Sequence, residues 1–129
     1  MHATFEELPL NDLDKAWCAG LLEGEGSFWV TKYSKLDGSF GYSAQLQMAM
    51  NQRDRDVVEK LHSLLGGSVN GPYKPKKNHP GQGEMITWGL YRKENALKVI
   101  KTLYPLLGKR RQEQCQKVWK NLTGVDYAQ

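Results

Sequence analysis

The chain has 129 residues, 40% of them hydrophobic and 25% charged, which provides apolar side chains for one core but not for two. With a mean hydropathy of -0.63 and no apolar run of membrane-spanning length, the composition is typical of a globular chain and argues against a membrane or disordered one. We therefore expect a single domain over residues 1–129. The acidic start lacks the features of a secretory signal, and Cys18 and Cys115 are the only cysteines, so we expect an intracellular protein with free thiols and no membrane partner.

Charge is distributed unevenly around the formal net value of +4. Residues 1–26 carry six acidic side chains and one basic one, which leaves 17 basic and eight acidic side chains in the remainder. A basic body of this kind favours a polyanionic partner such as nucleic acid. Many unrelated basic proteins show a similar asymmetry, so charge alone leaves the function open.

The first half of the chain predicts a helix, a hairpin and a second helix. Asn11 and Asp12 are good N-cap residues and Gly26 is a good terminator, so residues 13–24 should form the first helix. Residues 27–35 and 41–50 alternate with a period near two on either side of a Leu-Asp-Gly-Ser turn, which predicts a hairpin. Residues 54–65 place their aliphatic side chains on one face and end at two glycines, which predicts the second helix.

The second half repeats this order. Residues 68–74 and 84–91 predict another hairpin, with a long mobile connection between its strands. Helical spacing predicts two further helices, over 93–103, where Pro105 interrupts the pattern, and over 109–122. The order αββαββαα predicts an α+β fold, in which the two hairpins form one antiparallel sheet with helices on one face and the other face open.

The end of the first helix breaks the local rules for a helix that only packs. Gly20 and Gly24 each cost about 1 kcal/mol relative to alanine in a helix interior. Glu23 and Glu25 lie at the end where the helix dipole disfavours negative charge. Such violations often mark a functional segment, because something else must compensate for them.

Two compensations would explain these residues. The small residues Ala16, Gly20 and Gly24 recur every four positions, so they would let the same helix of a second chain approach closely. Acidic residues that meet at such a twofold axis would need a divalent cation between them, and Mg²⁺ accepts carboxylate and carbonyl oxygens. The plainer alternative is that the glycines form turns and the glutamates are solvated. A phosphate-binding loop is disfavoured, since the glycine spacing does not fit and the acidic side chains would repel phosphate.

The string Cys-Ala-Gly-Leu-Leu-Glu-Gly-Glu-Gly at residues 18–26 resembles the defining motif of the LAGLIDADG homing endonucleases. The resemblance covers about residues 13–122, and it includes the element order, a glutamine after the second strand, a tryptophan in the fourth strand and the later Leu-x-Pro-Leu-Leu and Lys-Arg-Arg-Gln segments. Cys18 replaces the usual leucine, and glutamates replace both aspartates. Cysteine is a small hydrophobe and should pack acceptably, and glutamate keeps the carboxylate.

The resemblance implies a catalytic set. Glu25 and the carbonyl of Gly24 would bind Mg²⁺ or Mn²⁺, whereas Glu23 would cap and pack a helix. Gln52 and Lys109 would reach the solvent around the scissile phosphate, although an ungapped count selects Arg110 instead of Lys109. The metal would meet the need of phosphodiester hydrolysis for a nucleophilic water and a stabilised leaving oxygen. The alternative for the basic run is a solvated helix start or simple phosphate contacts.

The open face of the sheet is expected to contact DNA. Strand alternation directs Phe28 and Val30 toward the helices and their neighbours outward. Trp88 and Leu90 are expected in the core. Glutamine and lysine bond base edges, and apolar side chains touch thymine methyl groups. The candidate DNA-binding residues are Trp29, Thr31, Tyr33, Lys35, Gln45, Gln47, Ala49, Asn70, Lys74 and Thr87; a solvated polar face is the alternative for each.

The leading interpretation is a homodimeric, metal-dependent endonuclease that cuts both strands of a palindromic or near-palindromic DNA target, encoded within an intron or as a mobile element. Ala16, Gly20 and Gly24 would form its dimer interface. The alternatives are a maturase that binds its host intron RNA and a DNA-binding regulator without cleavage activity.

Overall fold

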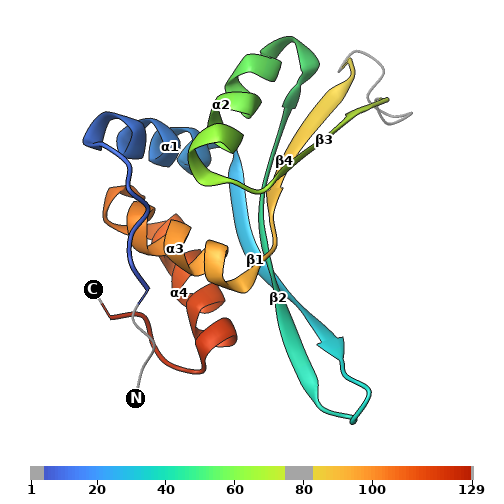
Figure 1. The fold of residues 1–129 in the computed structure, drawn as a ribbon, viewed down its shortest axis with the longest axis vertical. Coiled ribbons are helices and arrows are strands. Elements are labelled where there is room, and N and C mark those ends of the chain that lie inside the picture. The colour runs from blue at the N-terminus through green and yellow to red at the C-terminus, as the bar shows by residue number, and fades with distance from the viewer. Residues whose placement is uncertain (1–4, 75–82, 129) are drawn as a thin grey trace.

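A computed structural model describes residues 5–74 and 83–128. Within that part, four α-helices lie on one side of a four-stranded antiparallel sheet (Figure 1). The elements are α1 (Asp12–Glu25), β1 (Gly26–Ser34), β2 (Phe40–Asn51), α2 (Arg55–Leu65), β3 (Ser68–Tyr73), β4 (Met85–Leu90), α3 (Lys93–Leu103) and α4 (Lys109–Thr123). Short 3-10 turns at Gln52–Asp54 and Tyr104–Leu106 precede α2 and follow α3. The predicted α+β order and the open sheet face are confirmed.

The sheet has the strand order β1-β2-β4-β3, so the second hairpin adds to the sheet through β4. Trp29 lies opposite Gln45 in the β1–β2 pair, and Ala49 lies opposite Thr87 in the β2–β4 pair. The β1–β2 hairpin extends beyond the helices (Figure 1). The predicted connection between β3 and β4 falls largely on residues 75–82, which lie outside the described residues.

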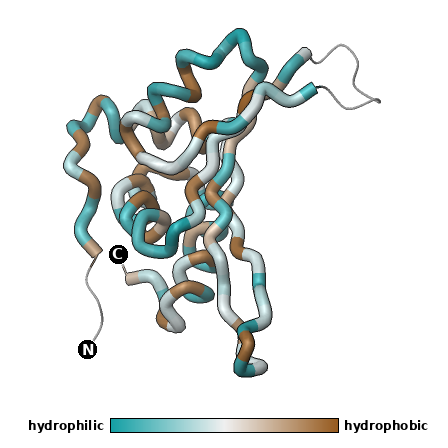
Figure 2. Tube along the Cα trace, turned by 45° about the vertical axis from the view of Figure 1, so that its right-hand side comes forward, coloured by the Kyte–Doolittle hydropathy of each residue, from teal (hydrophilic) through white to brown (hydrophobic). Residues whose placement is uncertain are grey.

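The core fills the space between the helices and the sheet. Trp88 and Leu90 are 0% and 1% exposed, as predicted, and the indole Nε1 of Trp88 donates to the carbonyl of Gly66 at 2.8 Å. Hydrophobic and hydrophilic residues alternate along the helices in Figure 2, which is the pattern of elements with one buried face. No described helix has the length and apolarity needed to cross a membrane.

The first helix begins and ends where its capping residues predict. The side chain of Asn11 accepts a hydrogen bond from the backbone N–H of Asp14 at 2.8 Å, and Gly26 is the C-cap. Cys18 and Leu22 are fully buried, so cysteine is accommodated at this position of the motif. The second helix begins one residue later than predicted, at Arg55, because Asn51 caps a separate 3-10 turn by accepting from the backbone N–H of Arg53 at 3.0 Å.

Candidate nucleic-acid interface

The carboxyl end of α1 carries two glutamates with different surroundings. The Oε1 atom of Glu23 accepts a hydrogen bond from the backbone N–H of Gly108 at 2.6 Å, and the Glu23 carbonyl accepts one from Arg111 Nε at 3.2 Å. Gly108 is the N-cap of α4, so this carboxylate lies at the positive end of the α4 dipole. The contact explains why an acidic side chain is tolerated at the carboxyl end of α1.

Glu25, two residues further along, is exposed. Within residues 5–74 and 83–128 its carboxylate has no hydrogen bond or ion pair. It borders a hollow of about 280 Å³, where the end of α1 meets the open face of the sheet. The residues that line this hollow are Glu25, Ser27, Gln47, Met48, Ala49, Thr87 and Tyr91. The structure thus brings the candidate metal ligand Glu25 together with three candidate DNA-binding residues.

A chain of hydrogen bonds crosses the open face beside this hollow. Gln45 Nε2 donates to Thr31 Oγ1 at 3.2 Å. Gln47 Nε2 donates both to Gln45 Oε1 at 3.0 Å and to the Tyr91 hydroxyl at 3.3 Å. We call Thr31, Gln45, Gln47 and Tyr91 the amide row. These hydrogen bonds fix the orientation of Gln45 and Gln47, which the sequence predicted only as separate DNA contacts.

Tyr91 was not among the candidate residues, although it lies at the centre of this surface. It follows the end of β4 and is 41% exposed. A Cβ atom on Gly89 would overlap the Tyr91 ring and hydroxyl, so the ring lies over Gly89. The signal was available, because Thr87, Gly89 and Tyr91 occupy every second position and therefore share one face of an extended chain.

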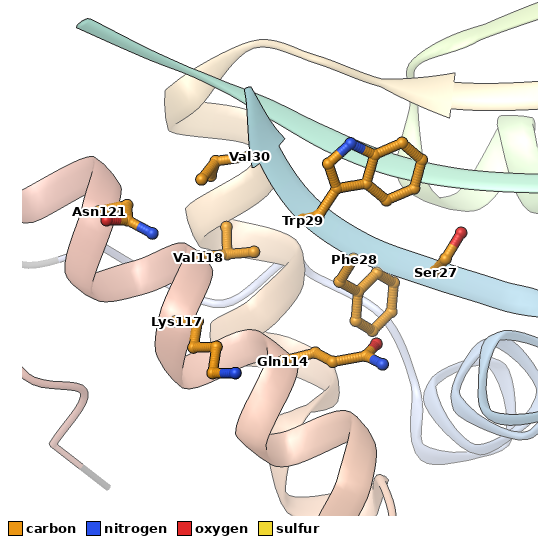
Figure 3. A pocket seen from close by; sticks show the side chains of 8 residues that line it. All are labelled: Ser27, Phe28, Trp29, Val30, Gln114, Lys117, Val118 and Asn121. Carbon is orange, nitrogen blue, oxygen red and sulfur yellow. The ribbon is translucent and has the colours of Figure 1, made fainter. Parts of the chain in front are cut away.

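The remaining open-face candidates are spread along the sheet. Figure 3 shows the side chain of Trp29 on the opposite side of β1 from α4, with Phe28 on the α4 side, as alternation predicts. Both residues border a second hollow of about 410 Å³ between β1 and α4. Tyr33 is exposed, with its ring over Gly41. Asn70 is exposed, and its carbonyl accepts from Thr87 Oγ1 at 3.4 Å.

Two candidate lysines lie just beyond the strands to which they were assigned. Lys35 follows the last residue of β1, and Lys74 follows the last residue of β3. Both are exposed. Their side chains are therefore free of sheet packing and available to a polyanion.

Gln52 and Lys109 do not line the hollow beside Glu25. Gln52 begins the turn after β2, and its backbone N–H donates to the carbonyl of Glu84 at 2.9 Å. Lys109 is exposed at the first turn of α4. The backbone N–H of the preceding Gly108 donates to the Glu23 carboxylate, so Lys109 lies close to the end of α1.

The predicted small-residue stripe forms an outward face of α1. Ala16, Gly20 and Gly24 are exposed, and a Cβ atom on Gly20 or Gly24 would meet no described atom within 4 Å. Leu13, one turn before Ala16, is 83% exposed. Packing among the described residues therefore gives no reason for glycine at positions 20 and 24.

Comparisons with known proteins agree with this geometry. The model of the LAGLIDADG endonuclease family matches residues 18–121, so the chain belongs to this family. No curated protein gives a significant match.

Solved structures of homing endonucleases share the fold. The structure of I-CvuI in complex with the I-CreI target in the presence of Mg, where the DNA is not cleaved, matches 82% of this chain at 18% identity and a TM-score of 0.62. The structure of I-TnaI matches 83% of this chain at 20% identity and the same TM-score. The chain spans 64% of the I-CvuI chain and 70% of the I-TnaI chain. The meganuclease I-SmaMI, bound to uncleavable DNA, matches 83% of this chain at 22% identity and a TM-score of 0.62, but only 35% of its own length is covered.

Proposed function

We propose that the protein is a homodimeric homing endonuclease that uses a divalent metal to hydrolyse both strands of a palindromic or near-palindromic DNA target. The observation that carries this proposal is the position of Glu25. Its carboxylate is exposed and unpaired within the described residues, at the junction of α1 and the open sheet face. An anionic group of this kind beside a surface for a polyanion calls for a cation between them.

The donor atoms at the end of α1 fit a hard cation such as Mg²⁺ or Mn²⁺. Glu25 supplies a carboxylate. The carbonyl of Gly24 belongs to the last four of the helix, which have no intrahelical partner. Oxygen donors of these two types are those that Mg²⁺ and Mn²⁺ prefer. When bound, such an ion would supply a nucleophilic water and stabilise the leaving oxygen of the phosphodiester.

Gln52 and Lys109 would act around the scissile phosphate. An amide can orient a water molecule through both a donor and an acceptor atom. The Lys109 ammonium would stabilise charge that develops on the phosphate. Arg110 is also exposed at the start of α4, whereas Arg111 is engaged by Glu23 and Gln114. The choice for the basic role is therefore between Lys109 and Arg110.

The stripe of Ala16, Gly20 and Gly24 supports the dimer. Its exposed surface would let two α1 helices pack closely around a twofold axis. This arrangement would place two Glu25 side chains next to each other, one for each DNA strand. It would also place two copies of the open face over equivalent half-sites, which is why a palindromic target is proposed.

The test is cleavage of a randomised duplex library by the purified protein in Mg²⁺, followed by sequencing of the cleaved ends. We expect symmetric end sequences from the wild type and none from Glu25→Gln, because a neutral amide is a poor metal ligand. Duplex binding by Glu25→Gln should be retained. Cleavage by Glu25→Gln at the wild-type rate would overturn the metal assignment. Duplex binding without cleavage by the wild type would favour a regulator, and binding only to structured RNA would favour a maturase.

A further inference from the structure

Gln47 uses the same amide atom for both of its contacts in the amide row. Its Nε2 donates to Gln45 Oε1 at 3.0 Å and to the Tyr91 hydroxyl at 3.3 Å. A primary amide has two hydrogens on nitrogen and two lone pairs on oxygen. Both hydrogens of Gln47 are thus engaged within the protein. Its Oε1 is the atom left to meet a ligand on the open face.

The Tyr91 hydroxyl accepts one of these hydrogens because the Tyr91 ring has a fixed position on the sheet. The ring lies over Gly89, where a Cβ atom would overlap it. The same ring borders the hollow that contains Glu25 and Gln47. The hydroxyl is therefore positioned beside the Gln47 amide by the backbone of β4.

We propose that Tyr91 is a specificity-determining residue that acts through Gln47, by making Gln47 a hydrogen-bond acceptor only. The inference rests on the proposed function, since it requires the open face to lie against duplex DNA. Tyr91 is a positioning residue in this scheme, because the atom that meets the base belongs to Gln47.

An acceptor-only side chain selects bases by the donors that they present in the major groove. Guanine and thymine present acceptors there, whereas cytosine presents its N4 amino group. Adenine presents an N6 amino group next to the N7 acceptor, and a free glutamine bonds both. Gln47 has no hydrogen left for N7, so a contact to adenine N6 would leave the neighbouring N7 acceptor unpaired, whereas cytosine has no acceptor beside its N4 group in the groove. We therefore expect a C·G pair to be preferred over an A·T pair at one position of each half-site.

The experiment is a binding selection from a randomised duplex library in EDTA, so that cleavage does not remove the bound duplexes, with sequencing of the bound fraction. In the wild type we expect a C·G pair at one position of each half-site, about tenfold over an A·T pair, whichever strand carries the cytosine. In Tyr91→Phe, Gln47 regains a free hydrogen, so an A·T pair should gain about tenfold relative to a C·G pair at that position alone. Circular dichroism establishes that each variant is folded.

Tyr42→Phe is the matched control. Tyr42 is another exposed tyrosine and lies on β2 like Gln47, but it is an odd number of residues away, on the opposite face of the strand, and it is outside the amide row. Its variant should leave the preferred base unchanged. Gln47→Glu, which is an acceptor in either orientation, should keep the cytosine preference whether residue 91 is Tyr or Phe.

Two results would overturn the inference while leaving the proposed function intact. One is a Tyr91→Phe profile identical to that of the wild type. The other is a wild-type preference for an A·T pair at one position that Gln47→Ala abolishes, since the paired contact to adenine N6 and N7 would require Gln47 to donate. A wild type that binds no duplex at all would overturn the proposed function and this inference with it.

Discussion

The carboxylate of Glu23 and the backbone N–H of Gly108 form a hydrogen bond of 2.6 Å between residues 85 positions apart. It joins the end of α1 to the start of α4. The same turn of α4 carries Lys109 and Arg110. The position of the proposed basic residue relative to Glu25 therefore depends on Glu23, a side chain that has no role in the proposed chemistry.

Glu23 and Glu25 should differ in their effects on stability. Glu23→Ala removes a helix cap and a favourable dipole interaction, so we expect the free energy of unfolding to fall by about 1 kcal/mol. Glu25→Ala removes an exposed side chain that has no hydrogen bond or ion pair among the described residues, so it should change the free energy of unfolding by less than about 0.5 kcal/mol. Urea unfolding of the two variants measures this. Equal losses would contradict the capping role.

Lys109→Met should slow cleavage by about 10² while leaving duplex affinity near the wild-type value, because the charge is needed in the transition state. Arg110→Met is the matched comparison, one residue further along the same exposed turn. Single-turnover cleavage in Mg²⁺, with duplex affinity measured separately, gives the two quantities. If only Arg110→Met slows cleavage, the ungapped count is correct and the basic role belongs to Arg110.

Gly20→Leu should separate assembly from folding. No described atom lies within 4 Å of a Cβ atom at position 20, and leucine is favoured over glycine in a helix by about 1 kcal/mol. The monomer should therefore stay folded, while the bulky side chain keeps the two α1 helices apart. Sedimentation should show a dimer for the wild type and a monomer for the variant, and cleavage should be lost with the dimer. A wild type that is monomeric both alone and on DNA would refute the interface.

Duplex binding should weaken steeply as salt rises, with a slope of log K against log salt of about -0.9 for each neutralised phosphate. Lys35→Ala should reduce the slope by about one phosphate. Trp29→Ala should lower affinity without changing the slope, since its exposed ring carries no charge. Titrations at several salt concentrations test the pair. A flat dependence in the wild type would argue against a nucleic-acid partner.

The buried thiols predict a loss of stability at alkaline pH. Burial raises the pKa of Cys115 from 9.0 to about 12 and that of Cys18 to about 11. The unfolded chain releases these protons from pH 9 upward while the folded chain keeps them, so the free energy of unfolding should fall as pH rises above 9. The stability advantage of the wild type over Cys115→Ala should therefore shrink by about 1 kcal/mol per pH unit up to about pH 11. An advantage that stays constant from pH 8 to about 11 would contradict this linkage.

Local patterns were sufficient to predict the elements, because caps and periodicity act over a few residues. Asn11 caps α1, and Trp88 faces the helices, as their positions in the sequence indicate. Contacts between distant segments were not predictable in this way. The position of the Tyr91 ring over Gly89 depends on the path of the backbone after the end of β4. The hydrogen bond between Gln47 and Tyr91 depends on the register between β2 and β4, which alternation alone does not fix.

If the proposed function holds, the amide row sets a rule for changing the DNA sequence that the protein recognises. Substitutions at residues that share a hydrogen-bond network have non-additive free-energy effects, whereas the effects of substitutions at distant residues add. Thr31, Gln45, Gln47 and Tyr91 would therefore have to be exchanged together, as one recognition unit. Lys35 and Asn70, outside that unit, could be exchanged one at a time. The side chains of the open face would then form a few groups that are exchanged together. Each group would be defined by its hydrogen bonds and not by the strand that carries its residues.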